Sequence, residues 1–293
     1  LTALLQGSHS GNQGTKTLLD QGLFTTLKQT SKDHGVTGTL EAAYADSNNL
    51  ILAISVDRPK LPSGGDWQLV PSVGKITTAD GIKLPPIGSE DTGNGATGVL
   101  GQGNTLIPTN PNSMEMVISF DTGQIQGNPA SLHLHAEFSY FCLDSNESKC
   151  APESRAHTIA NPYQFTYNFT IPFHVGHVVH VNKTTTSNGK AVTLERVVIT
   201  PSGTRLYIHG LTYVEISSHN GRLGNDETHL ITGEQTYHHL YLKPLGDPTN
   251  PQDPQYLDTT IFVPLMTVSK QQTWTLHILD PKHGSGWTFT FTV

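Results

Sequence analysis

The chain has 293 residues, of which 17 are Lys or Arg and 24 are Asp or Glu, so its formal net charge is −7. Charged residues make up only 14% of the chain, against about 25% in average proteins, whereas Gly and Pro are plentiful. This composition favours short strands and turns, the length suits two domains, and the absence of a basic run in the sequence argues against nucleic acid as a partner.

The beginning of the chain is expected to be an arm with a short helix, over residues 1–34. Four leucines between Thr15 and Gln29 share one face of a helix, but the segment is poorly capped, so an ordered arm is the alternative. No stretch of the sequence reaches the roughly 18 apolar residues that a membrane helix needs. Because Leu1 is not a natural start, we expect a piece of a longer protein, with any signal peptide or membrane helix absent from this sequence.

A pair of strands near residue 40 recurs in the second half of the chain. The tripeptide Thr-Leu-Glu occurs at Thr39 and again at Thr193, which is 154 residues later. In both copies apolar and polar residues alternate on either side of a turn, at 46–49 and at 201–203. The sequence therefore predicts one hairpin that occupies the same place in two domains.

Each half is also predicted to end on an aromatic strand, at 165–173 and at 287–293, with another alternating strand before it. Further strands are expected at 114–120 and 261–265, and a long loop at 85–112. The predicted fold is all-β, with two tandem immunoglobulin-like β-sandwich domains. The expected boundaries are 1–34 for the arm, 35–174 for the first sandwich and 175–293 for the second.

Histidines provide the main candidates for a metal site. His133, His135 and Glu137 fall on one face of a strand, in a spacing that zinc sites use. The opposite face of that strand carries Leu132, Leu134, Ala136 and Phe138, so the imidazoles are expected to point outward. The favoured interpretation is a solvated stripe without a metal.

No catalytic motif is recognisable in the sequence. It contains neither a Gly-x-Ser-x-Gly nucleophile elbow nor a solitary thiol. Residues 93–98 spell the Gly-x-Gly-x-x-Gly dinucleotide fingerprint, but they lack the strand and helix that this motif requires, so no cofactor is expected. We therefore expect a protein that is not an enzyme.

Cys142 and Cys150 are the only cysteines, and they flank a polar, turn-rich stretch. The expected arrangement is a disulfide across a short loop in an oxidising compartment; two reduced thiols or part of a metal site are the alternatives.

The segment from Gly22 to Leu50, which contains Asp33-His34-Gly35-Val36-Thr37 and Ala43-Tyr44-Ala45-Asp46, resembles a family of uncharacterised bacterial extracytoplasmic domains. The segment from Leu194 to Leu206 is similar to the immunoglobulin-like companion domain that often follows it. Such domains are found outside the membrane helix of anti-sigma-factor-like proteins. The resemblance implies a location and an architecture, and it transfers no sigma-factor-binding residue.

The function implied is that of a non-enzymatic extracytoplasmic sensor, scaffold or interaction module of a membrane-anchored regulator on the bacterial surface. Its expected partner is an unknown extracellular ligand or protein, and it would contact the membrane only through a helix absent from this sequence. A cell-wall-associated or carbohydrate-binding adhesive module is the first alternative, with Trp67 as a candidate for sugar stacking. A metal-dependent hydrolase that uses surface histidines is the second.

Overall fold

Most of the residues that the structure describes lie in β-strands. The computed structural model describes residues 18–57, 67–71, 75–86, 107–110, 113–144, 163–212, 228–233, 235–238, 240–244, 252–253, 258–263, 271–280 and 283–293. The chain divides into two compact units, Leu1–Val175 and Gly176–Val293. Each unit has two antiparallel sheets, so the prediction of an all-β chain built from tandem sandwiches is confirmed.

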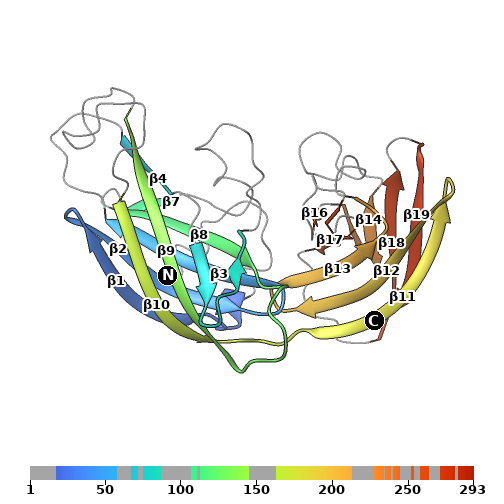
Figure 1. Ribbon diagram of the computed structural model, residues 1–293, viewed down its shortest axis with the longest axis horizontal. Helices are drawn as coiled ribbons and strands as arrows, with labels where there is room; N and C mark the ends of the chain where they lie inside the picture. Colours follow the sequence, from blue (N-terminus) through green and yellow to red (C-terminus); the bar gives the residue numbers. More distant parts are fainter. Residues whose placement is uncertain are drawn as a thin grey trace. The chain divides into compact units, whose positions relative to one another are not determined.

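In the first unit, one sheet has the strand order β1-β2-β3-β8-β7 and the other has the order β10-β9-β5-β6, with β4 also paired to β9. Figure 1 shows β1, β2 and β3 side by side in blue, with β9 and β10 of the second sheet in front of them. The strands are β1 (Thr25–Asp33), β2 (Val36–Ala45), β3 (Asn49–Asp57), β4 (Trp67–Pro71), β5 (Lys75–Thr78), β6 (Lys83–Leu84), β7 (Ile107–Asn110), β8 (Ser113–Asp121), β9 (Ser131–Asp144) and β10 (Tyr163–Pro172).

In the second unit, the two sheets have the orders β11-β12-β13-β17-β16 and β15-β14-β18-β19. The strands are β11 (His177–Ser187), β12 (Lys190–Thr200), β13 (Gly203–His209), β14 (His229–Thr232), β15 (Gln235–Tyr237), β16 (Tyr241–Pro244), β17 (Asp258–Val263), β18 (Thr273–Asp280) and β19 (Ser285–Thr292). Apart from β4, which has no counterpart among the described strands of the second unit, these sheets repeat the strand order of the first unit, with β2-β3 matching β12-β13 and β9-β10 matching β18-β19.

The repeat extends to backbone irregularities that have no sequence signature. The pairing of β1 with β2 shifts between Thr26 and Gln29, and the pairing of β11 with β12 shifts between His180 and Lys183. The residue at each shift has a positive φ, 51° at Lys28 and 48° at Asn182. These positions are again 154 residues apart. Because a bulge redirects a strand, its presence at the same place in both copies shows that the two units share a detailed backbone plan.

Each unit has its own apolar core between its two sheets. In the first unit, Leu40, Leu52 and Ile54 face Leu134 and Phe169. The second unit packs its residues in the same way, and its core contains Leu194, Leu206, Ile208, Leu276 and Phe289. Burial of each such side chain contributes about 1.5 to 3 kcal/mol, which explains why the apolar residues alternate along these strands.

In each unit, side chains of the first sheet also form hydrogen bonds with the edge strand of the second sheet, β10 or β19. The backbone of that strand thereby gains hydrogen-bond partners on its open side. In the first unit, the backbone N–H of Gln164 donates to Oδ2 of Asp33 at 2.8 Å. In the second unit, Nζ of Lys183 donates to the carbonyl oxygen of Thr290 at 3.0 Å. An open edge with free N–H and C=O groups invites pairing with another chain, and these contacts reduce that exposure.

The N-terminal segment differs from the expectation. Only Leu18–Asp20 is helical among the described residues, and residues 25–33 of the expected arm form β1 instead. Leu18, Leu23 and Phe24 cover the outer face of the first sheet, where they pack on Tyr44 and Ile51. The leucines that precede β1 are therefore buried against the outer face of the first sheet. Leu27, within β1, instead follows the alternation of partly buried and exposed positions along that strand.

Candidate functional site

Histidines mark the outer face of the second sheet in both units. His135 on β9 lies opposite Asn168 of β10, and His277 on β18 lies opposite Thr288 of β19. The two histidines occupy equivalent positions, because Leu134 and Leu276 beside them fill the same place in the two cores. Alternation along the strands then directs both imidazoles away from the core.

In the first unit the predicted stripe of His133, His135 and Glu137 lies on this outer face. Nδ1 of His133 is 2.8 Å from Oγ1 of Thr170, and Nδ1 of His135 is 2.7 Å from Oδ1 of Asn168. Nε2 of His135 also lies 3.2 Å from Oε1 of Glu137. The hydrogen bond to Asn168, followed by that to Glu137, raises the pKa of His135 above its usual value. A protonated ring donates to both oxygens at once, and a neutral ring donates to only one.

This arrangement is a ladder of hydrogen bonds across two strands. Each imidazole of the stripe bonds to the residue opposite it on β10, which orients the two rings separately. Within the part of the chain that the structure describes, no group of three or more His, Cys, Asp and Glu side chains is placed to hold a metal ion.

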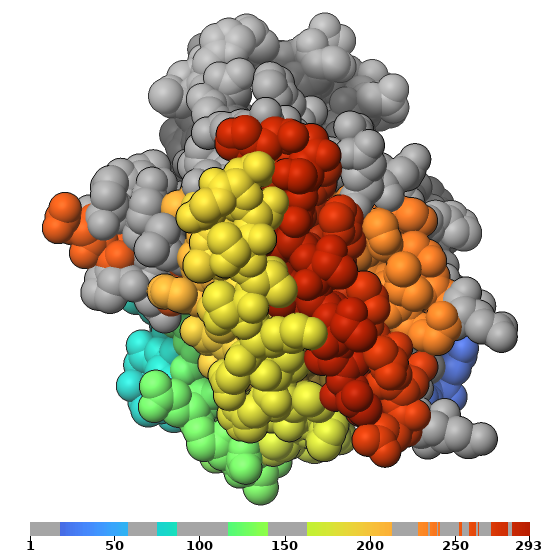
Figure 2. All heavy atoms as spheres, turned by 90° about the vertical axis from the view of Figure 1, so that its right-hand side faces the viewer, coloured from blue at the N-terminus to red at the C-terminus, as the bar shows by residue number. Residues whose placement is uncertain are grey.

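The second unit brings together three histidines that the sequence analysis did not connect. His229 on β14 is the direct cross-strand neighbour of His277 on β18, and their ring centroids are 5.5 Å apart. On the other side of His229, the ring of His238 follows at 5.7 Å. Figure 2 looks onto this side of the unit, where β14 and β15 in orange lie beside β18 and β19 in red. We call His238, His229 and His277 the histidine row.

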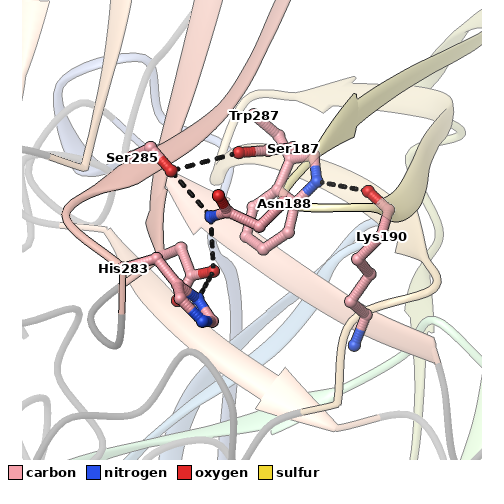
Figure 3. Close-up of polar contacts among 7 residues, drawn as sticks. Ser187, Asn188, Lys190, His283, Ser285 and Trp287 are labelled. Carbon is pink, nitrogen blue, oxygen red and sulfur yellow. Dashed lines mark hydrogen bonds and ion pairs between the residues drawn. The ribbon is translucent and has the colours of Figure 1, made fainter.

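A second polar cluster joins two hairpins of the same unit, and it contains the residue types of a catalytic triad. Nδ1 of His283 lies 2.7 Å from Oδ2 of Asp280. Nδ2 of Asn188 donates to Oγ of Ser285 at 2.7 Å and, more weakly at 3.4 Å, to Oδ2 of Asp280. In Figure 3 the Asn188 amide lies between Ser285 and the turn that carries His283. Of the two described side chains, His283 bonds to Asp280 and Ser285 bonds to Asn188, so the base does not reach the hydroxyl as a triad requires.

The same cluster explains why Asn188 occupies this turn. Asn188 and Gly189 connect β11 to β12 with φ angles of 49° and 76°. Such turns favour Asn-Gly because both residues adopt the left-handed region at low cost. Beside them, Nε1 of Trp287 donates to the carbonyl oxygen of Lys190 at 3.0 Å, which is another of the links drawn between the two hairpins in Figure 3. We call this cluster the hairpin clasp, and its contacts are those of a structural joint.

Asp46, the most deeply buried acid among the described residues of the first unit, is also part of a turn. Its Oδ1 accepts the backbone N–H groups of Asn48 and Asn49 at 2.8 and 2.9 Å, and its side chain has no exposed surface. The hydroxyl of Tyr44 donates to its Oδ2 at 2.7 Å. Burial and then the neighbouring carboxylate raise the pKa of Tyr44 far above its usual range. An acid enclosed in this way cannot meet a substrate, and it fixes the hairpin.

Three of the sequence predictions fall outside the described residues. Cys142 lies on the β9 backbone, but Cys150 is outside the described ranges, so their disulfide stays a prediction. Residues 93–98 are also outside them. Trp67 begins β4, and its side chain is not among those described.

Comparison with known proteins adds information on the fold. No protein-family model and no curated protein matches the chain. Among solved structures, it is similar to the crystal structure of a conserved domain protein from Bacillus anthracis, with 11% sequence identity and a TM-score of 0.53. The match covers 93% of this chain and 89% of that one. At this identity the similarity shows a shared fold alone.

The helical content of the described residues is too small for a membrane span. None of their helices is long and apolar enough to cross a bilayer.

Proposed function

We propose that this chain is a non-enzymatic extracytoplasmic module of a membrane-anchored, anti-sigma-factor-like regulator, which acts as a sensor, scaffold or interaction surface. One observation carries the non-enzymatic part. Among the triad-like residues, His283 bonds to Asp280 and Ser285 bonds to Asn188, an arrangement that joins two hairpins and leaves the serine hydroxyl without its base.

The backbone plan supports a role as a scaffold. Two copies of one sandwich carry the same bulges at the same offset, and the outer strand of each second sheet is tied to the first sheet by side chains such as Asp33 and Lys183. Rigid sheets of this kind hold loops and faces in fixed positions, which suits recognition by contact. The extracytoplasmic location rests on the family resemblance of the Gly22–Leu50 segment and on the composition of the chain.

A substrate panel tests the non-enzymatic part. The purified chain is incubated with chromogenic esters, peptides and glycosides, beside the variants Ser285→Ala and His283→Ala. We expect no turnover above the buffer rate for any of the three proteins. Hydrolysis by the wild type that is lost in both variants would overturn the proposal, because it would assign the hairpin clasp to catalysis. Hydrolysis that persists equally in both variants would place an active site elsewhere in the chain and would overturn it as well.

A further inference from the structure

The histidine row places three imidazoles side by side on three neighbouring segments of one sheet. His229 and His277 are directly opposite each other on antiparallel strands, and His238 follows β15 on the far side of His229. The adjacent residues Leu230 and Leu276 are fully buried, whereas His229 and His277 are partly exposed and His238 is exposed. The three rings thus lie on the outer face, within reach of an ion from solution.

The spacing of the rings is close to that of two imidazoles bound to one metal ion. With a metal–nitrogen bond of about 2.0 to 2.1 Å, the centroids of two ligating rings are roughly 4.5 to 5.2 Å apart, depending on the coordination angle. The observed separations are 5.5 and 5.7 Å. Small rotations of partly exposed side chains supply the remaining difference, and they need no movement of the strands.

One ring of the row is already oriented by a neighbour. Nδ1 of His277 is 2.9 Å from Oγ1 of Thr288 on β19. A hydrogen bond of this kind to one ring nitrogen orients the other nitrogen of a ligating histidine, and outer partners of this sort raise metal affinity.

From this geometry we propose that the histidine row binds one divalent transition-metal ion through two imidazoles, with His229 as the shared ligand and either His277 or His238 as the second. The remaining coordination positions are filled by water. Imidazole ligands suit Cu²⁺, Ni²⁺ and Zn²⁺, and Cu²⁺ is held most tightly of the three. The described residues place no group of three ligands around one point, which is why the proposal has two protein ligands. This site is independent of the proposed function.

The first unit provides an internal control for this site. There, His135 occupies the position of His277, but its cross-strand neighbour on β5 is Thr77 where the second unit has His229. The equivalent place therefore holds a single imidazole. The proposal predicts that Cu²⁺ binds to the second unit and that Thr77→His adds a comparable pair to the first.

Calorimetric titration of the untagged chain with Cu²⁺, in a buffer with a weak competing chelator, tests the proposal. We expect one saturable ion per chain, and nitrogen hyperfine structure from two imidazoles in its electron paramagnetic resonance spectrum. His229→Ala should weaken binding at least about tenfold, as should the double variant His238→Ala/His277→Ala, because each leaves no adjacent pair. The single variants His238→Ala and His277→Ala should each lose less affinity for Cu²⁺ than the double variant does.

The controls are His133→Ala and His135→Ala, which should bind Cu²⁺ as the wild type does, and Thr77→His, which should raise the stoichiometry from one ion to two. Far-ultraviolet circular dichroism confirms that each variant is folded. Unchanged binding in His229→Ala, loss of binding in the His133 or His135 variants, or absence of saturable binding in the wild type would each overturn the proposal. Failure of Thr77→His to add an ion would overturn the proposed two-imidazole geometry.

Discussion

Gly38 on β2 packs directly beneath the ring of Phe165 on β10, so that a Cβ atom at position 38 would lie 2.9 Å from two atoms of that ring. The hydroxyl of Tyr167 would be closer still, at 2.6 Å. The absence of a side chain at position 38 thus makes room for the Phe165 ring and the Tyr167 hydroxyl.

This close approach predicts the effect of a larger residue at position 38. Gly38→Ala should destabilise the protein by about 1 to 3 kcal/mol through overpacking, and Gly38→Val by more. The double variant Gly38→Val/Phe165→Leu, which shortens the side chain opposite position 38, should lose less stability than the sum of the two single variants. Urea unfolding measures these variants. Additive losses in the double variant would contradict the close contact.

The buried carboxylate of Asp46 should be important for stability. Asp46→Ala removes the acceptor of Tyr44 and of two backbone N–H groups, so we expect a loss of about 2 to 4 kcal/mol in the free energy of unfolding. Asp46→Asn keeps one acceptor oxygen and should cost less. Asp80→Ala, at an exposed acid of the same unit, is the control and should change stability by less than about 0.5 kcal/mol. Equal stability of the Asp46→Ala and Asp80→Ala proteins would refute this role.

The pKa of His135 should lie above the usual histidine value of 6.5, because its protonated ring donates to both Asn168 and Glu137. A pKa that is raised in the folded state stabilises the fold below the unfolded pKa, and this contribution is lost as the pH rises through the folded pKa. The contribution should be small because the site is exposed to solvent.

Titration by nuclear magnetic resonance measures this pKa in the wild type and in two variants. Asn168→Ala should lower it more than Glu137→Gln does, since the bond to Asn168 is the larger cause. A wild-type value at or below 6.5, or a larger change in Glu137→Gln, would show that the ladder does not hold the ring as described.

The hairpin clasp should contribute to the free energy of unfolding through its hydrogen bonds. This contribution can be measured separately from that of the turn conformation by comparing two variants of Asn188. Asn188→Gly keeps the left-handed backbone and removes the contacts to Ser285 and Asp280, so it should cost about 1 kcal/mol. Asn188→Ala adds the strain of a positive φ, which is worth roughly 1 to 2 kcal/mol more.

His34, at the equivalent turn of the first unit, supplies the matched control. It has a φ of 47°, and its ring, which is mostly exposed to solvent, pairs with Asp33. His34→Gly should therefore be close to neutral in thermal unfolding. A loss at His34→Gly as large as that at Asn188→Gly would mean that the turn conformation, and not the clasp, accounts for the effect.

Local patterns in the sequence were sufficient to predict the main strands and the repeat of the hairpin. Alternation located the hairpin at Thr39 and its copy at Thr193, and the matched offsets placed them in equivalent sheets. For the segment between Thr15 and Gln29 the sequence left a short helix and an ordered arm as alternatives; among the described residues only Leu18–Asp20 is helical, and β1 begins at Thr25, because the leucines serve a short apolar cover and a strand. The periodicity of apolar residues predicts that a residue is buried, but it does not predict which element the residue packs against.

The clusters were beyond the reach of local patterns. The sequence placed His133, His135 and Glu137 on an outer face, since all three belong to one strand. His229 and His277 are neighbours only through the pairing of β14 with β18, and Asn188 meets Ser285 only through the meeting of two hairpins. Such contacts depend on strand order and register, which periodicity along one segment does not encode.

The most direct test of the proposed role is the position of the full-length natural protein in intact bacterial cells. A membrane-impermeant, amine-reactive biotin reagent is applied to the cells, and labelling of lysines such as Lys75 and Lys83, exposed on the first unit, is read by mass spectrometry after fractionation. The account predicts that these lysines are labelled in intact cells and that the protein sediments with the membranes. Labelling only after lysis, with the protein in the soluble fraction, would contradict it.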